Sequence, residues 1–263
     1  NKLMGFVFNP IAAAQLPCKC CDGKALLYDV ADFNKNCEVP RNPDVLPVAG
    51  IPVYYYRCVN CAFVFTPFFD SFTAEDFSRH IYNDQYILVD PDYKELRPQG
   101  NARFIADLFA DFKNISVLDY GGGNGTLENL LKQNGFKDIA TYDPFSPNYS
   151  TKPQKQFDLI VSFEVFEHTT DPKNTVKEVL GLLKPNGMLM FSTMMQPENI
   201  ADIKTNWWYI GPRNGHVSIY SEQSLQYLAE QAGYQFGHFN QGLHLLCREI
   251  PVFAKHFLDP GAA

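Results

Sequence analysis

The stretch that most restricts the possible folds is an apolar run that passes straight into a glycine-rich turn and then into a helical pattern. It reads VLDYGGGNGTLENLL and covers residues 117–131. Backbone without side chains can turn tightly and come close to a bound molecule where a strand ends. The stretch therefore predicts a strand, a ligand-binding turn and a helix in succession.

Strand-like and helical patterns alternate after this turn. IATYD, FDLIVSF and MLMFST read as buried strands, and YQFGHFN with LHLLCRE near the carboxyl end reads as a closing strand pair. Between them, Asp171 and Pro172 are typical of a helix start, as an N-cap and a first-turn proline. This alternation predicts an α/β fold with a doubly wound sheet.

The spacing of the glycines helps to identify the ligand. Gly121, Gly123 and Gly125 form G-x-G-x-G, whereas the dinucleotide pattern requires glycine where this chain has Thr126. An acid just before the turn, Asp119, also argues against a neighbouring pyrophosphate. A second acid follows the next strand, at residue 143, where it can accept hydrogen bonds from ribose hydroxyls. The pattern favours S-adenosylmethionine over a dinucleotide.

Four blocks resemble the class I S-adenosylmethionine-dependent methyltransferases in their order and spacing. They are VLDYGGGNG, TYDPF, FDLIVSFEVFEH and LLKPNGMLMFST, and the resemblance covers about residues 101–248. It implies a Rossmann-like methyltransferase sheet of seven strands, with an antiparallel strand in the last pair. The segment between Asp143 and Phe157 is shorter than usual, so we expect the strand there to be short or missing.

The same resemblance implies a cofactor-binding set. The methionine part would meet the turn, the ribose would meet Asp143, and the sulfonium centre would pass the end of the third strand. Two connector tyrosines, Tyr82 and Tyr86, would close over the cofactor. The full set is Asp119, Tyr120, Gly121, Gly122, Gly123, Asn124, Asp143, Pro144, Phe145, Phe163, Glu164, Tyr82 and Tyr86.

Two C-x-x-C pairs near the amino end predict a metal site. The four cysteines are Cys18, Cys21, Cys58 and Cys61. Four thiolates from two tight turns complete a tetrahedral zinc shell, which makes the metal structural. Cys20 lies inside the first pair and could compete with Cys21, whereas Cys37 and Cys247 read as ordinary residues.

These patterns suggest four consecutive segments. Residues 1–69 would form the zinc-binding module, 70–100 a helical connector or lid, 101–250 the methyltransferase domain and 251–263 a tail. A four-cysteine module followed by such a domain, with YNDQY in the connector, resembles bacterial sugar and polysaccharide-pathway methyltransferases. That resemblance implies a carbohydrate or nucleotide-linked sugar as the acceptor of the methyl group.

Methyl transfer also needs a base for the acceptor's proton. One candidate cluster is EVFEH, with Glu164, Glu167 and His168; ubiquinone-pathway O-methyltransferases carry the same pattern and can hold a divalent cation there. The other is TNWWYIGPRNGHVSIYS, where His216 is preferred as the base over His168. This second cluster is also the expected substrate-binding segment, through Trp207, Trp208, Tyr209, Arg213 and Asn214.

Composition excludes several other classes of function. The formal net charge is −7, and Lys19, Lys24 and Arg57 do not form a basic patch beside the cysteines, so nucleic-acid and anionic-membrane binding are not expected. Without a recognisable leader or span in the sequence, a cytoplasmic location is expected. The alternatives are a quinone-type O-methyltransferase and a non-catalytic protein that keeps the cofactor fold. The sequence does not name the acceptor, the methylated atom or the oligomeric state.

Overall fold

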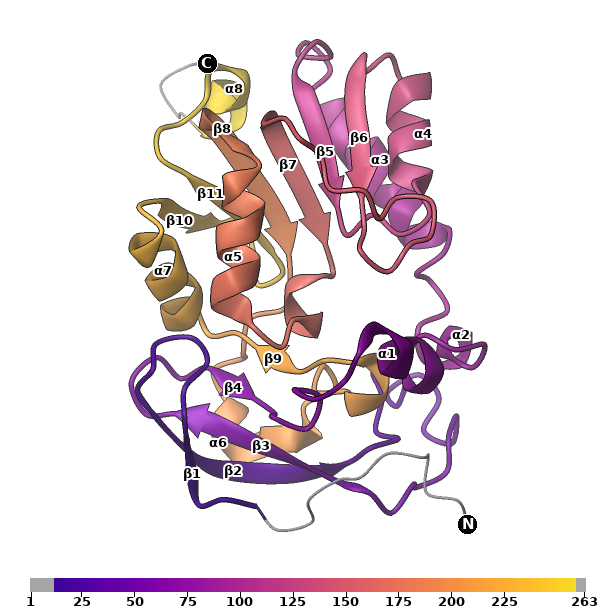
Figure 1. Ribbon diagram of the computed structural model, residues 1–263, viewed down its shortest axis with the longest axis vertical. Helices are drawn as coiled ribbons and strands as arrows, with labels where there is room; N and C mark the ends of the chain where they lie inside the picture. Colours follow the sequence, from indigo (N-terminus) through magenta and orange to yellow (C-terminus); the bar gives the residue numbers. More distant parts are fainter. Residues whose placement is uncertain (1–11, 259–263) are drawn as a thin grey trace. The chain divides into compact units, whose positions relative to one another are not determined.

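The computed structural model describes residues 12–258, which form two units, each with its own sheet (Figure 1). Unit 1 contains the described residues up to Pro91, together with Glu167–Pro172 and Met194–Tyr227. Unit 2 contains Asp92–Phe166, Lys173–Thr193 and the described residues from Leu228 onward. The division is interleaved along the chain, whereas the sequence suggested consecutive segments.

Part of the expectations concerns residues outside the described range. The start of the expected zinc-binding module, residues 1–11, and the end of the expected tail, residues 259–263, lie outside the described residues. Within residues 12–258, no helix combines the length and the apolar character needed to cross a bilayer.

The sheet of unit 2 has six strands in the order β10-β11-β8-β7-β5-β6. Their bounds are β5 Ser116–Tyr120, β6 Asp138–Tyr142, β7 Phe157–Phe163, β8 Leu183–Ser192, β10 Gln235–His238 and β11 Leu243–Cys247. The four strands β6, β5, β7 and β8 are parallel, and β11 and β10 follow as antiparallel strands at one edge. The predicted α/β sheet and its closing strand pair are confirmed.

The expected count of seven strands is wrong for the described residues. The chain passes from Tyr142 to Phe157 without a further strand, because this short, proline-containing segment forms turns instead. The sheet therefore ends at β6, and the acid that follows β6 lies at its edge.

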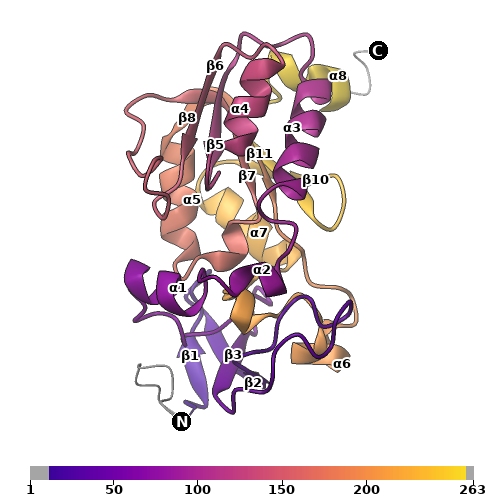
Figure 2. The same cartoon turned by 90° about the vertical axis from the view of Figure 1, so that its right-hand side faces the viewer.

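Helices cover both faces of the sheet in unit 2 (Figures 1 and 2). Helices α3 (Leu96–Leu108) and α4 (Thr126–Gln133) lie on one face, and α5 (Pro172–Gly181) lies on the other. Buried Ile105 and Leu127 from the first two helices pack with Leu159 and Met190 from the strands. Because both faces are covered, the buried runs LIV in β7 and MLMF in β8 are apolar throughout. Helix α7 (Glu222–Gln231) precedes β10, and α8 (Lys255–Leu258) ends the described chain.

Unit 1 is built on an antiparallel sheet of five strands in the order β1-β2-β3-β4-β9. The strands are β1 Gln15–Pro17, β2 Lys24–Asp32, β3 Pro52–Cys58, β4 Val64–Phe65 and β9 Ser218–Ile219. Short helices α1 (Ala74–His80), α2 (Tyr86–Val89) and α6 (Ile200–Ile203) complete it, with 3-10 turns at Phe166–His168, Lys204–Asn206 and Pro212–Asn214. The pairing of β9 with β4 brings the segment after β8 into this unit.

Candidate functional site

The turn after β5 requires glycine for two separate physical reasons. Gly121, Gly123 and Gly125 have φ of 78°, 59° and 74°, in the left-handed region that side chains disfavour. At Gly122 the obstacle is steric, because a Cβ would lie 2.1 Å from Oδ2 of Asp119. The turn therefore packs directly against Asp119 near the end of β5, and its glycines present backbone atoms rather than side chains.

Asp119 is buried, and its environment opposes ionisation. Desolvation, with smaller contributions from the charges of Asp143 and Glu128, raises the pKa of its carboxyl to about 7. A cationic group bound beside these carboxylates would favour their charged forms. S-adenosylmethionine carries a sulfonium and an ammonium group, so the chemistry of this turn fits that cofactor.

Asp143 holds the turn through its side chain. Its Oδ2 accepts a hydrogen bond from the amide of Gly123 at 2.9 Å, and its Oδ1 accepts one from the amide of Phe145 at 2.8 Å. A carboxylate oxygen has more than one lone pair, so these bonds leave acceptor capacity for ribose hydroxyls. Pro144 and Phe145 are exposed beside it, with Phe145 55% exposed, as an adenine contact would require.

The side chains of two predicted cofactor-binding residues, Tyr120 and Asn124, form hydrogen bonds with other residues of the chain. The hydroxyl of Tyr120 donates to Oε1 of Glu178 on α5 at 2.7 Å. Oδ1 of Asn124 accepts from the amide and the hydroxyl of Thr126 at the start of α4. These arrangements favour cofactor contacts from the backbone of Tyr120 and Asn124 rather than from their side chains.

Tyr149 is a residue that the sequence reasoning missed. A Cβ on Gly125 would lie 2.3 Å from the Tyr149 hydroxyl, so this side chain lies directly against the turn. Its carbonyl also accepts a hydrogen bond from the amide of Asp143 at 2.9 Å. The only signal in the sequence was an aromatic residue within the shortened connection after β6.

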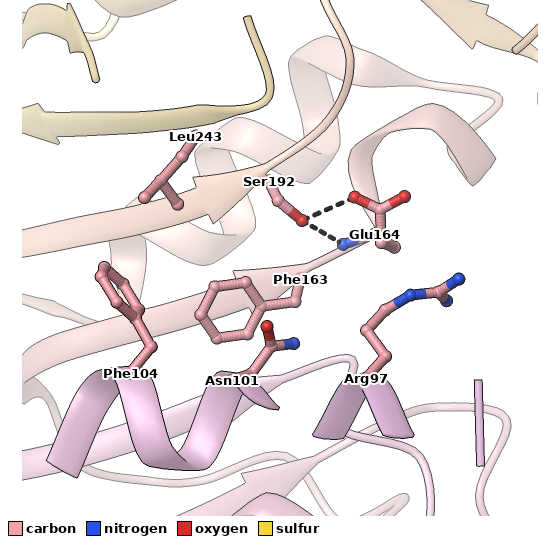
Figure 3. Close-up of a pocket in the computed structure, with 7 residues that line it drawn as sticks. All are labelled: Arg97, Asn101, Phe104, Phe163, Glu164, Ser192 and Leu243. Atoms are coloured by element: carbon pink, nitrogen blue, oxygen red, sulfur yellow. Dashed lines mark hydrogen bonds between the residues drawn. The ribbon is translucent and has the colours of Figure 1, made fainter. Parts of the chain in front are cut away.

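A pocket of about 370 Å³ opens where β7 and β8 end (Figure 3). Glu164 follows β7 with a φ of 54°, an uncommon conformation for a residue with a side chain. Its amide donates to Oγ of Ser192 at 2.9 Å, and that hydroxyl donates back to Oε1 of Glu164 at 2.7 Å. The lining residues are Arg97, Asn101, Phe104, Phe163, Glu164, Ser192 and Leu243.

The two candidate histidines lie together in unit 1. The Nδ1 atom of His168 lies 3.1 Å from the carbonyl oxygen of Gly215, and the Nδ1 atom of His216 lies 2.7 Å from the carbonyl oxygen of Tyr209. The centres of the two imidazole rings are 4.9 Å apart. A carbonyl oxygen only accepts, so each Nδ1 carries the donated proton. His216 is only 6% exposed, whereas His168 is half-buried.

Buried Glu167 lies beside this histidine pair. Its Oε1 accepts a hydrogen bond from the hydroxyl of Tyr209 at 2.7 Å. Ligand-type atoms of Glu167, His168 and His216 lie within 4.8 Å of one another. Glu164, the first acid of EVFEH, belongs to unit 2 and is not in this group.

Most of the predicted substrate-binding side chains are buried within unit 1. Trp207 and Tyr209 are 7% and 1% exposed, whereas Trp208 is 41% exposed. The Arg213 guanidinium donates to the carbonyl of Ile81 and to the side chain of Asn83, both at 2.8 Å. The Asn214 side chain accepts from the amide of Cys37 at 2.8 Å and donates to the carbonyl of Val89 at 2.9 Å. Of this set, Trp208 has the exposure that stacking on an acceptor needs.

The connector tyrosines also belong to unit 1. The rings of Tyr82 and Tyr86 meet edge to face at 5.2 Å, and Tyr82 packs against His168 at 6.1 Å. Tyr86 is buried. A role for either residue over the cofactor stays a prediction.

The four cysteines of the two pairs converge in unit 1. Their sulfur atoms lie within 4.8 Å of one another, with Sγ–Sγ distances of 3.7 Å for Cys18 and Cys61 and 3.4 Å for Cys21 and Cys58. Thiolates about 2.3 Å from a tetrahedral zinc ion would be roughly 3.8 Å apart, whereas a disulfide needs about 2.05 Å. Cys20 is not part of this group: its Sγ donates to the carbonyl of Ser224 at 3.5 Å, although its side chain also lies within reach of Cys61. The geometry fits zinc and separates Cys20 from the ligand set.

Comparison with known proteins agrees with this geometry. The sequence model of a family described as "Methyltransferase domain" matches residues 93–238, more than half of the chain. A ubiquinone biosynthesis O-methyltransferase from Coxiella burnetii is 32% identical over an alignment that covers 31% of this chain and 44% of that protein. A malonyl-[acyl-carrier protein] O-methyltransferase from Porphyromonas gingivalis is 39% identical over an alignment that covers 34% of this chain and 41% of that protein. The chain therefore spans less than half the length of these curated relatives.

Solved structures resemble the chain at lower sequence identity. Magnesium protoporphyrin IX methyltransferase from Synechocystis with bound SAH is 17% identical, with a TM-score of 0.45 over 68% of this chain and 94% of that one. An O-methyltransferase family protein from Burkholderia thailandensis is 15% identical, with a TM-score of 0.47 over 64% of this chain and 59% of that one.

Proposed function

The chain belongs to the class I S-adenosylmethionine-dependent methyltransferase family, and on this premise we propose that it is an enzyme that transfers the methyl group of S-adenosylmethionine to a small-molecule acceptor. The observation that carries the proposal is the glycine turn held between Asp119 and Asp143. When bound, the cofactor supplies an electrophilic methyl group. The chain's residues would bind and orient it.

Different groups in and beside the turn would contact the methionine, ribose and adenine parts of the cofactor. Backbone of residues 121–125 would lie against the methionine part, with Asp119 beneath it as a buried acid. Asp143 would accept hydrogen bonds from the ribose, and exposed Phe145 would lie against the adenine. These contacts use one compact unit, so orientation requires little further ordering of the chain.

Calorimetric titration with S-adenosylhomocysteine tests this proposal. We expect one binding site per chain and loss of binding when Gly121→Val and Asp143→Ala are combined. Unchanged binding in that double variant would remove the support for the cofactor site. Circular dichroism of the variant would show whether it is still folded.

For the acceptor, two classes have specific support. A carbohydrate or nucleotide-linked sugar is supported by the order of a four-cysteine module and a methyltransferase domain. A phenolic acceptor is supported by the curated relatives, which include ubiquinone biosynthesis O-methyltransferases at 32% identity. Methylation assays with labelled cofactor, on one set of sugar nucleotides and one set of hydroxylated aromatic acids, would separate the two.

A structural zinc ion is proposed for unit 1, held by Cys18, Cys21, Cys58 and Cys61. The closeness of the four sulfur atoms supports this site. Four protein ligands would complete the shell, so the ion would stabilise the fold rather than bind the acceptor. Elemental analysis of protein purified without added metal would measure its stoichiometry.

The acceptor's proton has three candidate bases, which are His216, His168 and Glu164. His216 is almost completely buried and its Nδ1 is bonded to a backbone carbonyl, so bracing the loop accounts for its surroundings. Glu164 lines a pocket in the unit that carries the glycine turn. We therefore favour Glu164 over the histidines.

A further inference from the structure

We propose that the pocket at the ends of β7 and β8 binds the acceptor, and that the acceptor is a hydroxylated aromatic ring with an acidic substituent. This inference rests on the proposed methyltransferase function and assigns its acceptor site. All seven lining residues belong to unit 2, the unit that also carries Asp119, the glycine turn and Asp143. Cofactor and acceptor would therefore be bound by one unit.

The pocket and the glycine turn follow neighbouring parallel strands, β7 and β5. Glu164 and Val165 follow β7 directly, and a Cβ on Gly121 would lie 2.4 Å from Cγ2 of Val165. Glu164 therefore lines the pocket, and the next residue, Val165, packs against the glycine turn. An acceptor beside Glu164 would be close to a cofactor seated on that turn.

The lining separates an apolar end from a polar end (Figure 3). Phe104, Phe163 and Leu243 lie together at one end, and Arg97 and Glu164 lie toward the other, with Asn101 and Ser192 between them. A sugar presents hydroxyls around its whole ring and would need polar partners on more sides. A flat aromatic ring with its polar groups on one edge matches this separation.

One face of helix α3 forms a wall of the pocket. Arg97, Asn101 and Phe104 are four and three residues apart, so they lie on one face of the helix. The order along the helix places a guanidinium, an amide and a phenyl ring in succession. A guanidinium suits an acidic substituent, and the phenyl ring suits the body of the acceptor.

The volume restricts the size of the acceptor. The pocket measures about 370 Å³, near the lower end of the range for small-molecule sites, which is roughly 300–1,000 Å³. A single substituted ring fits such a space. Larger acceptors would have to extend outside the lined part.

Ser192 is a positioning residue for Glu164 in this arrangement. Its hydroxyl contacts both the amide and the carboxylate of Glu164, which fixes a side chain on backbone with a positive φ. The acceptor's O–H proton would pass to the Glu164 carboxylate as the O–CH₃ bond forms. Transfer would break the S–CH₃ bond, with the electron pair left on sulfur in S-adenosylhomocysteine.

The test uses the full chain saturated with S-adenosylhomocysteine and 3,4-dihydroxybenzoate as the probe. We expect the probe to bind, and Phe104→Ala or Leu243→Ala to weaken it by about tenfold, since each removes apolar contact area. The affinity for S-adenosylhomocysteine should stay within about twofold. Phe239→Ala is the matched control, because Phe239 is 43% exposed and is not among the lining residues.

Charge and positioning are tested separately. Arg97→Gln should weaken 3,4-dihydroxybenzoate but not catechol, which lacks the carboxylate, and Arg103→Gln on an exposed position of α3 should change neither. With labelled cofactor, Glu164→Gln should slow turnover about a hundredfold. Ser192→Ala should lower kcat, and Ser192→Thr should restore it.

The outcomes distinguish this inference from the function on which it rests. Failure of the wild-type chain to bind S-adenosylhomocysteine would refute the proposed function itself. If the cofactor product binds but UDP-glucose occupies the site in place of the aromatic probe, the acceptor class is wrong. If Phe104→Ala and Leu243→Ala weaken S-adenosylhomocysteine as much as the probe, the pocket belongs to the cofactor, and the inference is overturned.

Discussion

The amide of Gly123 donates a hydrogen bond to Oδ2 of Asp143 at 2.9 Å, across 20 residues of sequence. The acid expected to bind the ribose is therefore also a support of the turn expected to bind the methionine part. Because one carboxylate does both, a change at residue 143 would affect the ligand and the local fold together.

Asp143→Asn separates these two effects. The amide can replace only one of the two acceptor oxygens, and its NH₂ group would face a backbone N–H. We expect a loss of about 1–2 kcal/mol in the free energy of unfolding and a larger loss of S-adenosylhomocysteine affinity. Urea unfolding and calorimetric titration measure the two quantities, and wild-type affinity in this variant would contradict a ribose contact.

Asp119 should make stability depend on pH in a particular direction. Its pKa in the folded chain is about 7, above the ordinary value of 3.8, mainly because of burial. The stability it contributes is present below pH 3.8 and is lost as pH rises through 7. Asp119→Asn should therefore be more stable than the wild type at pH 8, by on the order of 2–4 kcal/mol, with the gap closing toward pH 4. Thermal unfolding of both proteins across this range is the measurement, and an equal gap at both ends would refute it.

Gly122→Ala should disrupt the turn. The added Cβ would lie 2.1 Å from Oδ2 of Asp119, so the backbone or the buried acid has to move. We expect loss of S-adenosylhomocysteine binding and a lower Tm. Gly100→Ala is the control, because Gly100 lies within α3 with no atom within 4 Å of the added group, and it should be neutral or stabilising by about 0.5–1 kcal/mol.

Cys58→Ser should release the proposed zinc ion. Three thiolates leave the shell open, so metal content and Tm should both fall. Cys20→Ser is the matched control, because Cys20 is outside the four-sulfur group and its sulfur donates to the carbonyl of Ser224. Full zinc content in Cys58→Ser, or loss of zinc in Cys20→Ser, would show that the ligand set is wrong.

His216→Ala distinguishes the two kinds of base. If His216 braces its loop, its removal should cost about 1–3 kcal/mol of stability, because the carbonyl of Tyr209 loses its shorter hydrogen bond and keeps the Cys37 thiol at 3.7 Å. The rate of methyl transfer in a single turnover should then fall less than in Glu164→Gln. A much larger fall in His216→Ala, with its Tm preserved, would instead support His216 as the base.

Residue pattern alone determined the βα units, the glycine turn with its flanking acids, and the two cysteine pairs. These features depend on local requirements, such as the positive φ of Gly121 and the apolar runs of strands covered on both faces. The methyltransferase fold could be inferred from them because they recur in a fixed order along the chain. The family resemblance implied a seventh strand, whereas the short segment after Asp143 favoured a short or missing strand.

Only the tertiary structure decided which side chains are exposed and which partners they meet. Tyr209 and Arg213 have the chemistry of substrate-binding residues, but they are buried and bonded to Glu167 and to the carbonyl of Ile81. Arg97 and Ser192, from segments about 95 residues apart, line one pocket with Glu164. Burial and convergence depend on long-range packing, and a local residue pattern does not contain that information.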